Sequence, residues 1–303
     1  MTYTAVIKGK ERTLPAPASV VYDCSEDAPA DSFTGVFPMD EMPGAISGVR
    51  IYGAGGGLVF DGIVDIQKDI SAGKTYALLS ARSRAGLLLD SEPPPQSYTY
   101  PSLPVIYERH VKPYGFTGFT GSRQQYKGTV TVTKGMSEWQ VVAAYCRHFL
   151  RVTPRVRGGV LDASGELPQT EVVFCNRTGV RYSSAERKNR YCDRYSETYA
   201  PPQPGGAYVL AQADSETEAL GIIRKRCIAS GGGAYAAMKE TDRKSCLFTV
   251  DCPGGIPAQL YSQASLKDPF LGDTAGLYVS GFNYTADGRG EHCKVMLRKR
   301  QSG

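Results

Sequence analysis

The first ninety residues alternate apolar and polar positions with the two-residue period of β-strands. This pattern predicts strands over residues 49–52, 58–66 and 74–80, followed by a short helix over residues 82–90. A cluster of glycines joins the first two strands and supplies the positive φ angles that a hairpin turn needs. The cluster does not match the G-x-G-x-x-G phosphate-binding pattern, because Leu58 replaces the last glycine and a strand follows it.

Three consecutive prolines interrupt the chain after this β region. Pro93, Pro94 and Pro95 are incompatible with a helix interior and with a central strand, so we expect a domain boundary there. Beyond them the pattern becomes mixed. It predicts a helix over residues 102–110, a strand over 126–133 and a tight hairpin over 155–161.

A second helix of this mixed block has a clear beginning. Ser137 and Gln140 form the S-x-x-Q pattern of a capping box. The apolar residues that follow lie on one stripe of the helix: Trp139, Val142, Ala143, Cys146, Phe149 and Leu150. Trp139 is the chain's one tryptophan, and its place on this stripe predicts a core position rather than a ligand site.

The last part of the chain returns to a β pattern, apart from one predicted helix. The expected strands are 171–175, 180–184, 192–199, 234–238, 247–251, 277–284 and 291–298. Ser215 and Glu218 form another capping box, and the helix that they open is expected near 215–230, ending at glycines 231–233. Four of its side chains are expected to point inward: Ala219, Leu220, Ile223 and Cys227. The basic residues 224–226 are interpreted as a solvated face near its C-terminal end.

Two stretches of the chain resemble each other at an offset of 219 residues. Residues 57–63 align with residues 276–282, and each stretch continues through a glycine-containing turn into an apolar strand that ends in basic residues. One interpretation is that two related β-barrels flank an inserted block. The other is that hairpins bounded by glycines look alike, and the pattern leaves both open.

Composition indicates a folded chain rich in turns and excludes several classes of protein. The 303 residues are 41% hydrophobic and include 34 glycines and 19 prolines, more turn formers than an average globular chain has. No run approaches the roughly 18–20 apolar residues of a membrane span, and the first fifteen residues lack the apolar centre of a secretory signal. The net charge of +5 allows a nucleic-acid partner without indicating one.

The cysteines indicate reduced thiols. There are eight: Cys24, Cys146, Cys175, Cys192, Cys227, Cys246, Cys252 and Cys293. This density is far below that of small disulfide scaffolds, and the close C-x2-C pairs of zinc sites are missing. We therefore expect free thiols in a protein made in a cytoplasm, without a structural metal.

The search for catalytic chemistry finds no constellation. The sequence has three histidines, no H-E-x-x-H, no G-x-S-x-G and no Walker pattern. Five carboxylates form the nominal pool for sugar hydrolysis: Asp61, Asp65, Asp90, Glu92 and Glu108. Each is better interpreted as a turn, cap or surface group, so we predict no catalytic, cofactor-binding or metal-binding residues and no cofactor.

Several stretches carry a resemblance to a known family. They are residues 58–65, 80–84, 87–92, 134–142, 158–161, 250–254 and 276–292. In this order they resemble the baseplate hub proteins of contractile phage tails. That family comprises the late control protein D and the Mu-type tail proteins, whose fold is related to that of the T4 hub.

The resemblance implies a fold and a domain plan. The fold class is mainly β with an α+β insertion: two tube-like β-barrels plus a small α/β domain. The first barrel is expected in residues 1–92 and the inserted α/β domain in residues 93–168. The second barrel, with its helix near 215–230, is expected in residues 169–303.

The resemblance also implies a structural role without enzymatic activity. Three chains would form a ring that adapts a six-fold tail tube to a three-fold central spike, because each chain offers two similar barrels. The implied partners are two further copies, the tail tube or its initiator, the spike, baseplate wedge proteins and the tape measure, with non-specific passage of DNA through the lumen. The implied location is a phage tail, or a tailocin or other contractile injection particle, assembled in bacterial cytoplasm.

Two other functions stay open at this level. One is a cell-wall glycan hydrolase delivered by the same kind of particle, for which Glu92 and Glu108 are the residues to test. The other is a carbohydrate-binding β module, which a glycan pull-down would test.

Overall fold

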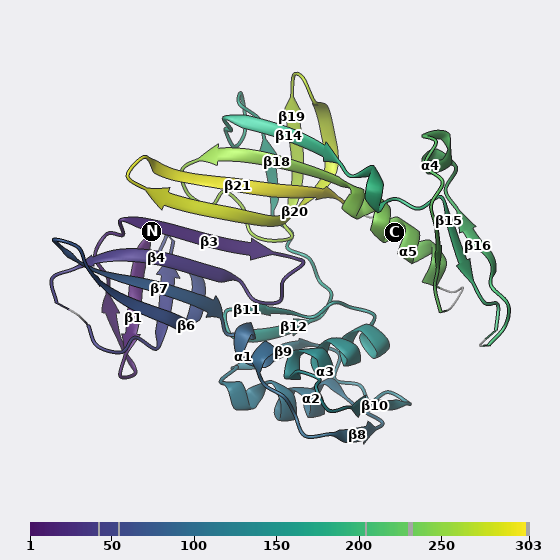
Figure 1. Cartoon of the computed structure of the whole chain (residues 1–303), viewed down its shortest axis with the longest axis horizontal. Coiled ribbons are helices and arrows are strands. Elements are labelled where there is room, and N and C mark those ends of the chain that lie inside the picture. Colours follow the sequence, from purple (N-terminus) through teal and green to yellow (C-terminus); the bar gives the residue numbers. More distant parts are fainter. Residues whose placement is uncertain (42, 54, 204, 230–232, 301–303) are drawn as a thin grey trace. The chain divides into compact units, whose positions relative to one another are not determined.

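The computed structural model describes residues 1–41, 43–53, 55–203, 205–229 and 233–300 (Figure 1). Strands account for 47% of the chain and helices for 17%, which confirms the mainly β class predicted from the sequence. The chain divides into two compact units. Unit 1 comprises Met1–Leu167 with Asn283–His292, and unit 2 comprises Pro168–Phe282 with Cys293–Gly303. The finer division at residues 92 and 168 stays a prediction.

Unit 1 opens with a sheet of antiparallel strands. Their bounds are β1 Thr2–Ile7, β2 Lys10–Thr13, β3 Ser19–Ser25, β4 Ser32–Met39, β5 Gly48–Tyr52, β6 Leu58–Ser71 and β7 Thr75–Ser83. The order across the sheet is β2-β1-β5-β6-β7-β4-β3. Beside β3 lies β20 (Gly272–Asp287), whose residues from Asn283 onward belong to this unit.

Alternate residues of these strands fill the interior of unit 1 with aromatic rings. Tyr3, Phe33, Phe37 and Phe60 are all at most 5% exposed, and their ring centroids lie 5.7–6.4 Å apart. Tyr22 packs edge-on against Phe60 at 5.3 Å. Aromatic side chains bury more apolar surface than other residues, so this cluster dominates the stability of the sheet.

The rest of unit 1 is a small α/β block. Its elements are α1 Ala85–Asp90, β8 Gln96–Thr99, α2 Leu103–His110, η1 Lys112–Tyr114, β9 Gly118–Gly121, β10 Thr129–Val132, α3 Glu138–Tyr145, the π-helical turn Cys146–Leu150, β11 Arg155–Arg157 and β12 Val160–Ala163. Strand β10 pairs with β8, and β12 pairs with both β11 and β9.

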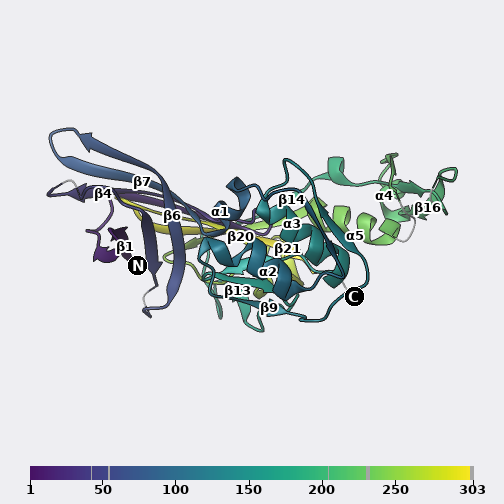
Figure 2. The same cartoon turned by 90° about the horizontal axis from the view of Figure 1, so that it is seen from below.

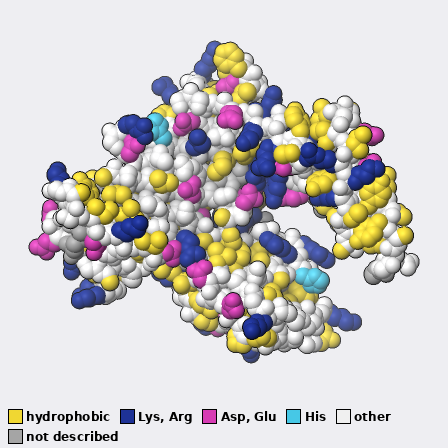
Figure 3. Space-filling view, in the orientation of Figure 1, with side chains coloured by type: hydrophobic (Ala, Val, Ile, Leu, Met, Phe, Trp, Pro, Cys, Tyr) yellow, Lys and Arg dark blue, Asp and Glu magenta, His cyan; other side chains and the backbone are white. Residues whose placement is uncertain are grey.

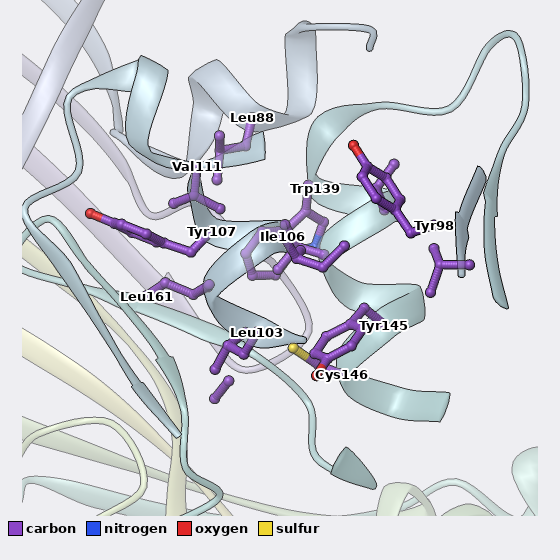
Figure 4. Packing of buried hydrophobic residues seen from close by; sticks show 14 of the residues in the cluster. Leu88, Tyr98, Leu103, Ile106, Tyr107, Val111, Trp139, Tyr145, Cys146 and Leu161 are labelled. Atoms are coloured by element: carbon purple, nitrogen blue, oxygen red, sulfur yellow. The ribbon is translucent and has the colours of Figure 1, made fainter. Parts of the chain in front are cut away.

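The core of this block lies between α2 and α3 (Figure 4). The predicted capping box is confirmed, since the Ser137 hydroxyl accepts a hydrogen bond from the Gln140 amide and the Gln140 side chain accepts one from the Ser137 amide. Trp139 is 8% exposed and belongs to the core cluster, together with Ile106 and Tyr145. The helices and hairpin predicted for this block are therefore confirmed.

The strands of unit 2 belong to the same hydrogen-bonded sheet, through β20. Its strands are β13 Glu171–Phe174, β14 Ser184–Asn189, β18 Cys246–Pro253, β19 Gln263–Asp268, β20 and β21 Gly290–Lys299. The order is β13-β19-β20-β21-β18-β14. Buried apolar residues alternate along β18 and β21, with Phe248, Val250, Val295 and Leu297 each at most 2% exposed.

Unit 2 also carries a lobe that the sequence analysis predicted incorrectly. Its elements are η3 Tyr191–Asp193, β15 Glu197–Ala200, β16 Val209–Ala213, α4 Ser215–Ala219, β17 Lys225–Cys227 and α5 Ala234–Ser245. The strand expected at 234–238 is the first half of α5, in which alanines favour a helix. The strand expected at 192–199 begins only at Glu197, and the strand expected at 180–184 gives way to β14, which begins at Ser184.

The helix expected near 215–230 is only five residues long. Asp214, not Ser215, caps it by accepting from the amides of Glu216 and Thr217. Gly221, with φ +72°, ends it in a left-handed turn. The side chains expected inward are exposed instead, Leu220 at 54% and Ile223 at 74%, and the basic run lies partly in β17. Of the glycines 231–233 that were expected to end the helix, the first two lie outside the described residues.

The two stretches that resemble each other in sequence both lie in long hairpins (Figures 1 and 2). Strands β6 and β7 are joined by a turn at Gly73, which has φ +72°. Strands β20 and β21 are joined by residues 288–289 and are neighbours in the sheet. Whether the two hairpins superpose stays a prediction.

Candidate functional site

In unit 1 two buried tyrosines come from strands that lie far apart in the strand order, β1 and β20. Tyr3 on β1 and Tyr284 on β20 are 5% and 1% exposed. Burial raises the pKa of Tyr3, and the Tyr284 side chain partly offsets the effect. Burial likewise raises the pKa of Tyr284, and Tyr3 and the Glu291 carboxylate raise it further. The two phenols therefore lie close together, and residues of β1 and of the β20–β21 hairpin meet there in a seam.

A cavity of about 450 Å³ opens beside this seam. Residues 1–3, residues 14–17 and the tip of the β20–β21 hairpin line it. Its charged groups are Asp287 and Glu291, and Asp287 is already paired with Arg289 at 2.8 Å, which lowers the pKa of the Asp287 carboxyl. The lining includes no histidine and no cysteine, so neither of these residue types can act there as a nucleophile or a metal ligand.

In unit 2 the segment before β14 bridges two strands, β19 and β18. The Tyr182 hydroxyl donates to Asp268 Oδ2 at 2.7 Å and to the Lys267 carbonyl at 3.1 Å, both at the end of β19. One residue later, the Ser183 amide donates to the Asp251 carbonyl on β18 at 2.8 Å. Burial and the bond to Asp268 raise the pKa of Tyr182 to about 12. The segment therefore links β19 to β18.

Four of the five carboxylates considered as candidates for sugar hydrolysis form ion pairs with arginine or lysine. Asp61 pairs with Arg50 at 2.9 Å and with Arg84 at 2.6 Å. Glu108 pairs with Lys112 at 2.7 Å across one helical turn. A glycosidase needs one carboxylic acid with a raised pKa, and ion pairing acts in the opposite direction.

Arg82 forms ion pairs with two more of these carboxylates, Asp65 and Asp90. Its guanidinium binds Asp65 at 2.7 Å and Asp90 at 2.5 Å, linking β7 to β6 and to α1. The bond to Arg82 lowers the pKa of Asp90. The fifth carboxylate, Glu92, is exposed on the loop after α1. These five residues therefore hold unit 1 together or face solvent.

A buried polar cluster that the sequence did not reveal lies in the α/β block. His110 Nδ1 is 2.5 Å from Glu138 Oε2, and His110 Nε2 is 2.8 Å from the Tyr98 hydroxyl. The Tyr114 hydroxyl donates to the other Glu138 oxygen at 2.9 Å. The carboxylate that contacts His110 comes from α3, 28 residues away in the sequence. His110 is 1% exposed, so the cluster fastens β8, α2 and α3 to one another.

Metal-ligand clusters and membrane-spanning helices are missing from the described residues. They include no group of three or more His, Cys, Asp or Glu side chains placed to hold a metal ion. All eight cysteines are free thiols. Among the described residues, no helix combines the length and the apolar character needed to cross a bilayer.

Solved structures provide the decisive comparison. A tail protein from Neisseria meningitidis MC58 superposes with a TM-score of 0.76 at 17% identity, over 98% of this chain and 96% of that one. A tail protein of prophage MuSo2 from Shewanella oneidensis gives 0.78 at 15% identity, over 98% of each chain. The chain has the fold of phage tail proteins. The same fold extends to an E. coli component of the type VI secretion system (TM-score 0.62, 8% identity, 95% of this chain and 75% of that one), described as similar to the T4 tail proteins gp27 and gp5.

Sequence comparison alone does not reach this result. No protein-family model matches the chain, and no curated protein sequence matches it either. The tail-protein fold covers both units almost completely, which confirms the hub-like fold implied by the resemblance. The contacts of Tyr182 with Asp268 and of Tyr3 with Tyr284 were missed because each pair joins segments far apart in the sequence.

Proposed function

We propose that the protein is a structural baseplate hub of a contractile tail. Three copies form a ring that adapts a six-fold tail tube to a three-fold central spike. The observation that carries this proposal is the match of nearly the whole chain, both barrels included, to two phage tail proteins at TM-scores of 0.76 and 0.78. Two barrels per chain give a trimer six similar faces, which is the number that a six-fold tube requires.

The other partners follow from this role. The ring contacts the tail tube or its initiator on one side and the spike on the other. Baseplate wedge proteins and the tape measure are its further partners. DNA crosses its lumen without sequence recognition. It works in a phage tail or a tailocin-like particle assembled in bacterial cytoplasm. The role needs no enzymatic step. The ion-paired carboxylates described above favour this role over glycan hydrolysis.

The test is the mass of the purified chain in solution. Light scattering coupled to size-exclusion chromatography is expected to give about 98 kDa, three times the 32.7 kDa of one chain. Electron microscopy of particles that contain it should place it at the junction of tube and spike. A chain that stays monomeric at tens of micromolar, and that particles carry elsewhere, would overturn the proposal.

A further inference from the structure

The α/β block of unit 1 carries the whole excess of positive charge of the chain. Residues 93–167 include nine lysines and arginines against four aspartates and glutamates, which is a net charge of +5. The other 228 residues include 26 of each kind and are neutral overall. Figure 3 shows Lys, Arg and His side chains together on the block, beside the end of α3. The positive charge is therefore concentrated in about a quarter of the chain.

The acidic residues of the block are engaged in contacts of their own. Glu138 is buried in the polar cluster described above. Glu108 pairs with Lys112 at 2.7 Å. Asp162 accepts hydrogen bonds from two hydroxyl groups, at 2.6 and 2.7 Å. Glu166, which is exposed, is the one acid of the block that remains to balance the other cations.

Two segments bring several of these cations together around the half-buried ring of Phe149. The centroid of this ring lies 5.9 Å from that of Tyr126 and 4.5 Å from that of His148. A Cβ atom built on Gly128 would lie 3.0 Å from the same ring. The loop before β10 and the π-helical turn after α3 therefore lie side by side. The exposed cations of these two segments, together with the exposed histidine, are called the cationic patch: Arg123, Lys127, Arg147, His148 and Arg151.

The charges of the cationic patch are not compensated within the described part of the chain. Its lysine and its three arginines form no ion pair with a described carboxylate. The C-terminal end of a helix favours cations, which accounts for Arg147 and His148 but not for the two cations of the loop. Arg151 adopts φ +60°, a left-handed conformation that residues other than glycine seldom take. Turns of π-helix and strained residues of this kind occur frequently at functional sites.

The surface of the patch suits a polyanion better than a second protein. Residues 106–190, all of which the structure describes, have no large apolar side chain among the exposed ones. Contacts between proteins have an apolar centre that is poor in lysine. Contacts between protein and DNA are more polar and much more positively charged. A guanidinium group also matches the geometry of a phosphate with two parallel hydrogen bonds.

We propose that the cationic patch binds the phosphate backbone of DNA. The inference rests on the proposed function, in which DNA crosses the ring, and it assigns the surface of each chain that contacts the DNA. Binding through phosphates reads no sequence and weakens steeply as the salt concentration rises.

The experiment measures the binding of a short, fluorescently labelled DNA duplex to the full chain by fluorescence anisotropy. The patch variant combines Lys127→Gln, Arg147→Gln and Arg151→Gln. The matched control combines Lys10→Gln, Lys68→Gln and Lys74→Gln, three exposed lysines of the first sheet, so both variants lose the same charge. We expect the wild type and the control to bind alike and the patch variant to bind about tenfold more weakly or worse at low salt.

The dependence on salt gives a second readout. The slope of log affinity against log salt concentration, measured between about 50 and 200 mM, should be smaller by about 2–3 for the patch variant, since each lost phosphate contact removes roughly 0.9. Thermal unfolding verifies that the variants are folded. Arg123→Gln combined with Lys127→Gln changes only the loop, so it provides an answer even if the substitutions in the π-helical turn prevent folding.

Three results would overturn the inference: a wild type that does not bind the duplex at low salt, a control that weakens binding as much as the patch variant, and displacement of the duplex by polyglutamate as efficiently as by unlabelled DNA. The last result would assign the patch to an acidic protein. The mass in solution tests the proposed function separately. A trimer that does not bind DNA contradicts this inference alone, whereas a monomer that binds DNA through the patch contradicts the trimeric ring and leaves the assigned surface in place.

Discussion

The ring of Phe60 covers the backbone of Gly62. A Cβ atom built on Gly62 would lie 2.3 Å from Cζ and 2.4 Å from Cε1 of that ring. Phe33 and Phe37 are placed in the same way over Gly35, at 2.7 and 2.6 Å. In unit 1, therefore, glycines in the strands create the space that the aromatic rings occupy. The barrel depends on these glycines for packing, not for turn geometry.

We expect Gly62→Ala to destabilise unit 1. The added methyl group collides with the Phe60 ring and lies 2.8 Å from the Arg82 carbonyl oxygen, so strands β6 and β7 must separate. Overpacking of this kind costs about 1–3 kcal/mol, which would lower the midpoint of urea unfolding. The matched control is Gly57→Ala in the turn before β6, where nothing lies within 4 Å of the new Cβ. Equal midpoints for the two variants would show that the Phe60 ring can move aside.

Gly179→Ala is the corresponding prediction for unit 2. A Cβ at residue 179 would lie 2.1 Å from the Val173 carbonyl oxygen, which already accepts a hydrogen bond from Val180 at 2.8 Å. The contact is with backbone, so no rotamer change relieves it, and the turn before Tyr182 must shift. We expect a loss of about 2 kcal/mol or more in the stability of unit 2.

The measurement for Gly179→Ala is native-state hydrogen exchange of β13 and β19, with Gly288→Ala as control. Gly288 lies in the turn of the β20–β21 hairpin and has no neighbour within 4 Å of a new Cβ. Faster exchange confined to β13 and β19 in Gly179→Ala is the expected result. Unchanged exchange there would mean that the turn tolerates the methyl group.

Local signals explain which parts of the fold could be predicted. The capping box at Ser137 and the apolar stripe of Trp139 are properties of neighbouring residues, and the structure has both. The helix predicted near residues 215–230 was wrong because two local signals in this segment conflict. Residues 219–227 have helical apolar spacing, but Gly221 stops the helix before that spacing can be used. The apolar spacing predicts which side of a helix would be buried. The left-handed turn at Gly221 ends the helix before that side can form.

The polar contacts could not be predicted, because their partners come from different elements. His110 and Glu138 belong to α2 and α3, and Asp268 and Tyr182 are 86 residues apart. No spacing rule connects such pairs. The sequence could suggest that the carboxylates were structural, but the arginines that bind Asp61, Asp65 and Asp90 could be identified only in the folded structure.

We expect Glu138→Gln to destabilise the α/β block far more than Glu108→Gln. Glu138 is 5% exposed and accepts from Tyr114 and contacts His110, so its replacement leaves buried polar groups without a full set of partners. The expected loss is about 1–3 kcal/mol. Glu108 makes an exposed pair with Lys112, and such pairs contribute roughly 0.3–0.5 kcal/mol. Thermal unfolding of both variants measures the difference. Equal melting temperatures would mean that the buried cluster contributes no more than a surface pair.

The last prediction concerns how the folding stability of unit 2 changes as the pH becomes acidic. The amides of Leu271 and Phe270 donate to Asp268 Oδ1 at 2.8 and 2.9 Å, and Tyr182 donates to Oδ2. The bond from Leu271, together with that from Tyr182, lowers the pKa of Asp268 below its ordinary value of 3.8. A carboxyl group whose pKa is lower in the folded state stabilises the fold above its unfolded pKa. That stabilisation is lost as the pH falls through the folded pKa.

Asp268→Asn should therefore reduce stability at pH 7 by a few tenths to about 1 kcal/mol, since solvent reaches this carboxylate and screens it. The gap between the variant and the wild type should narrow once the pH falls below about 4 and should vanish once Asp268 is protonated in both states. The control is Asp273→Asn, an exposed residue of the same hairpin, for which the stability difference at pH 7 should be close to zero. Urea midpoints measured from pH 7 to pH 2 test this directly. A stability difference that stays constant over this pH range would mean that the Asp268 charge does not contribute to stability. The Tyr182 bond to the Lys267 carbonyl and the backbone bonds around it would then hold the segment before β14 in place.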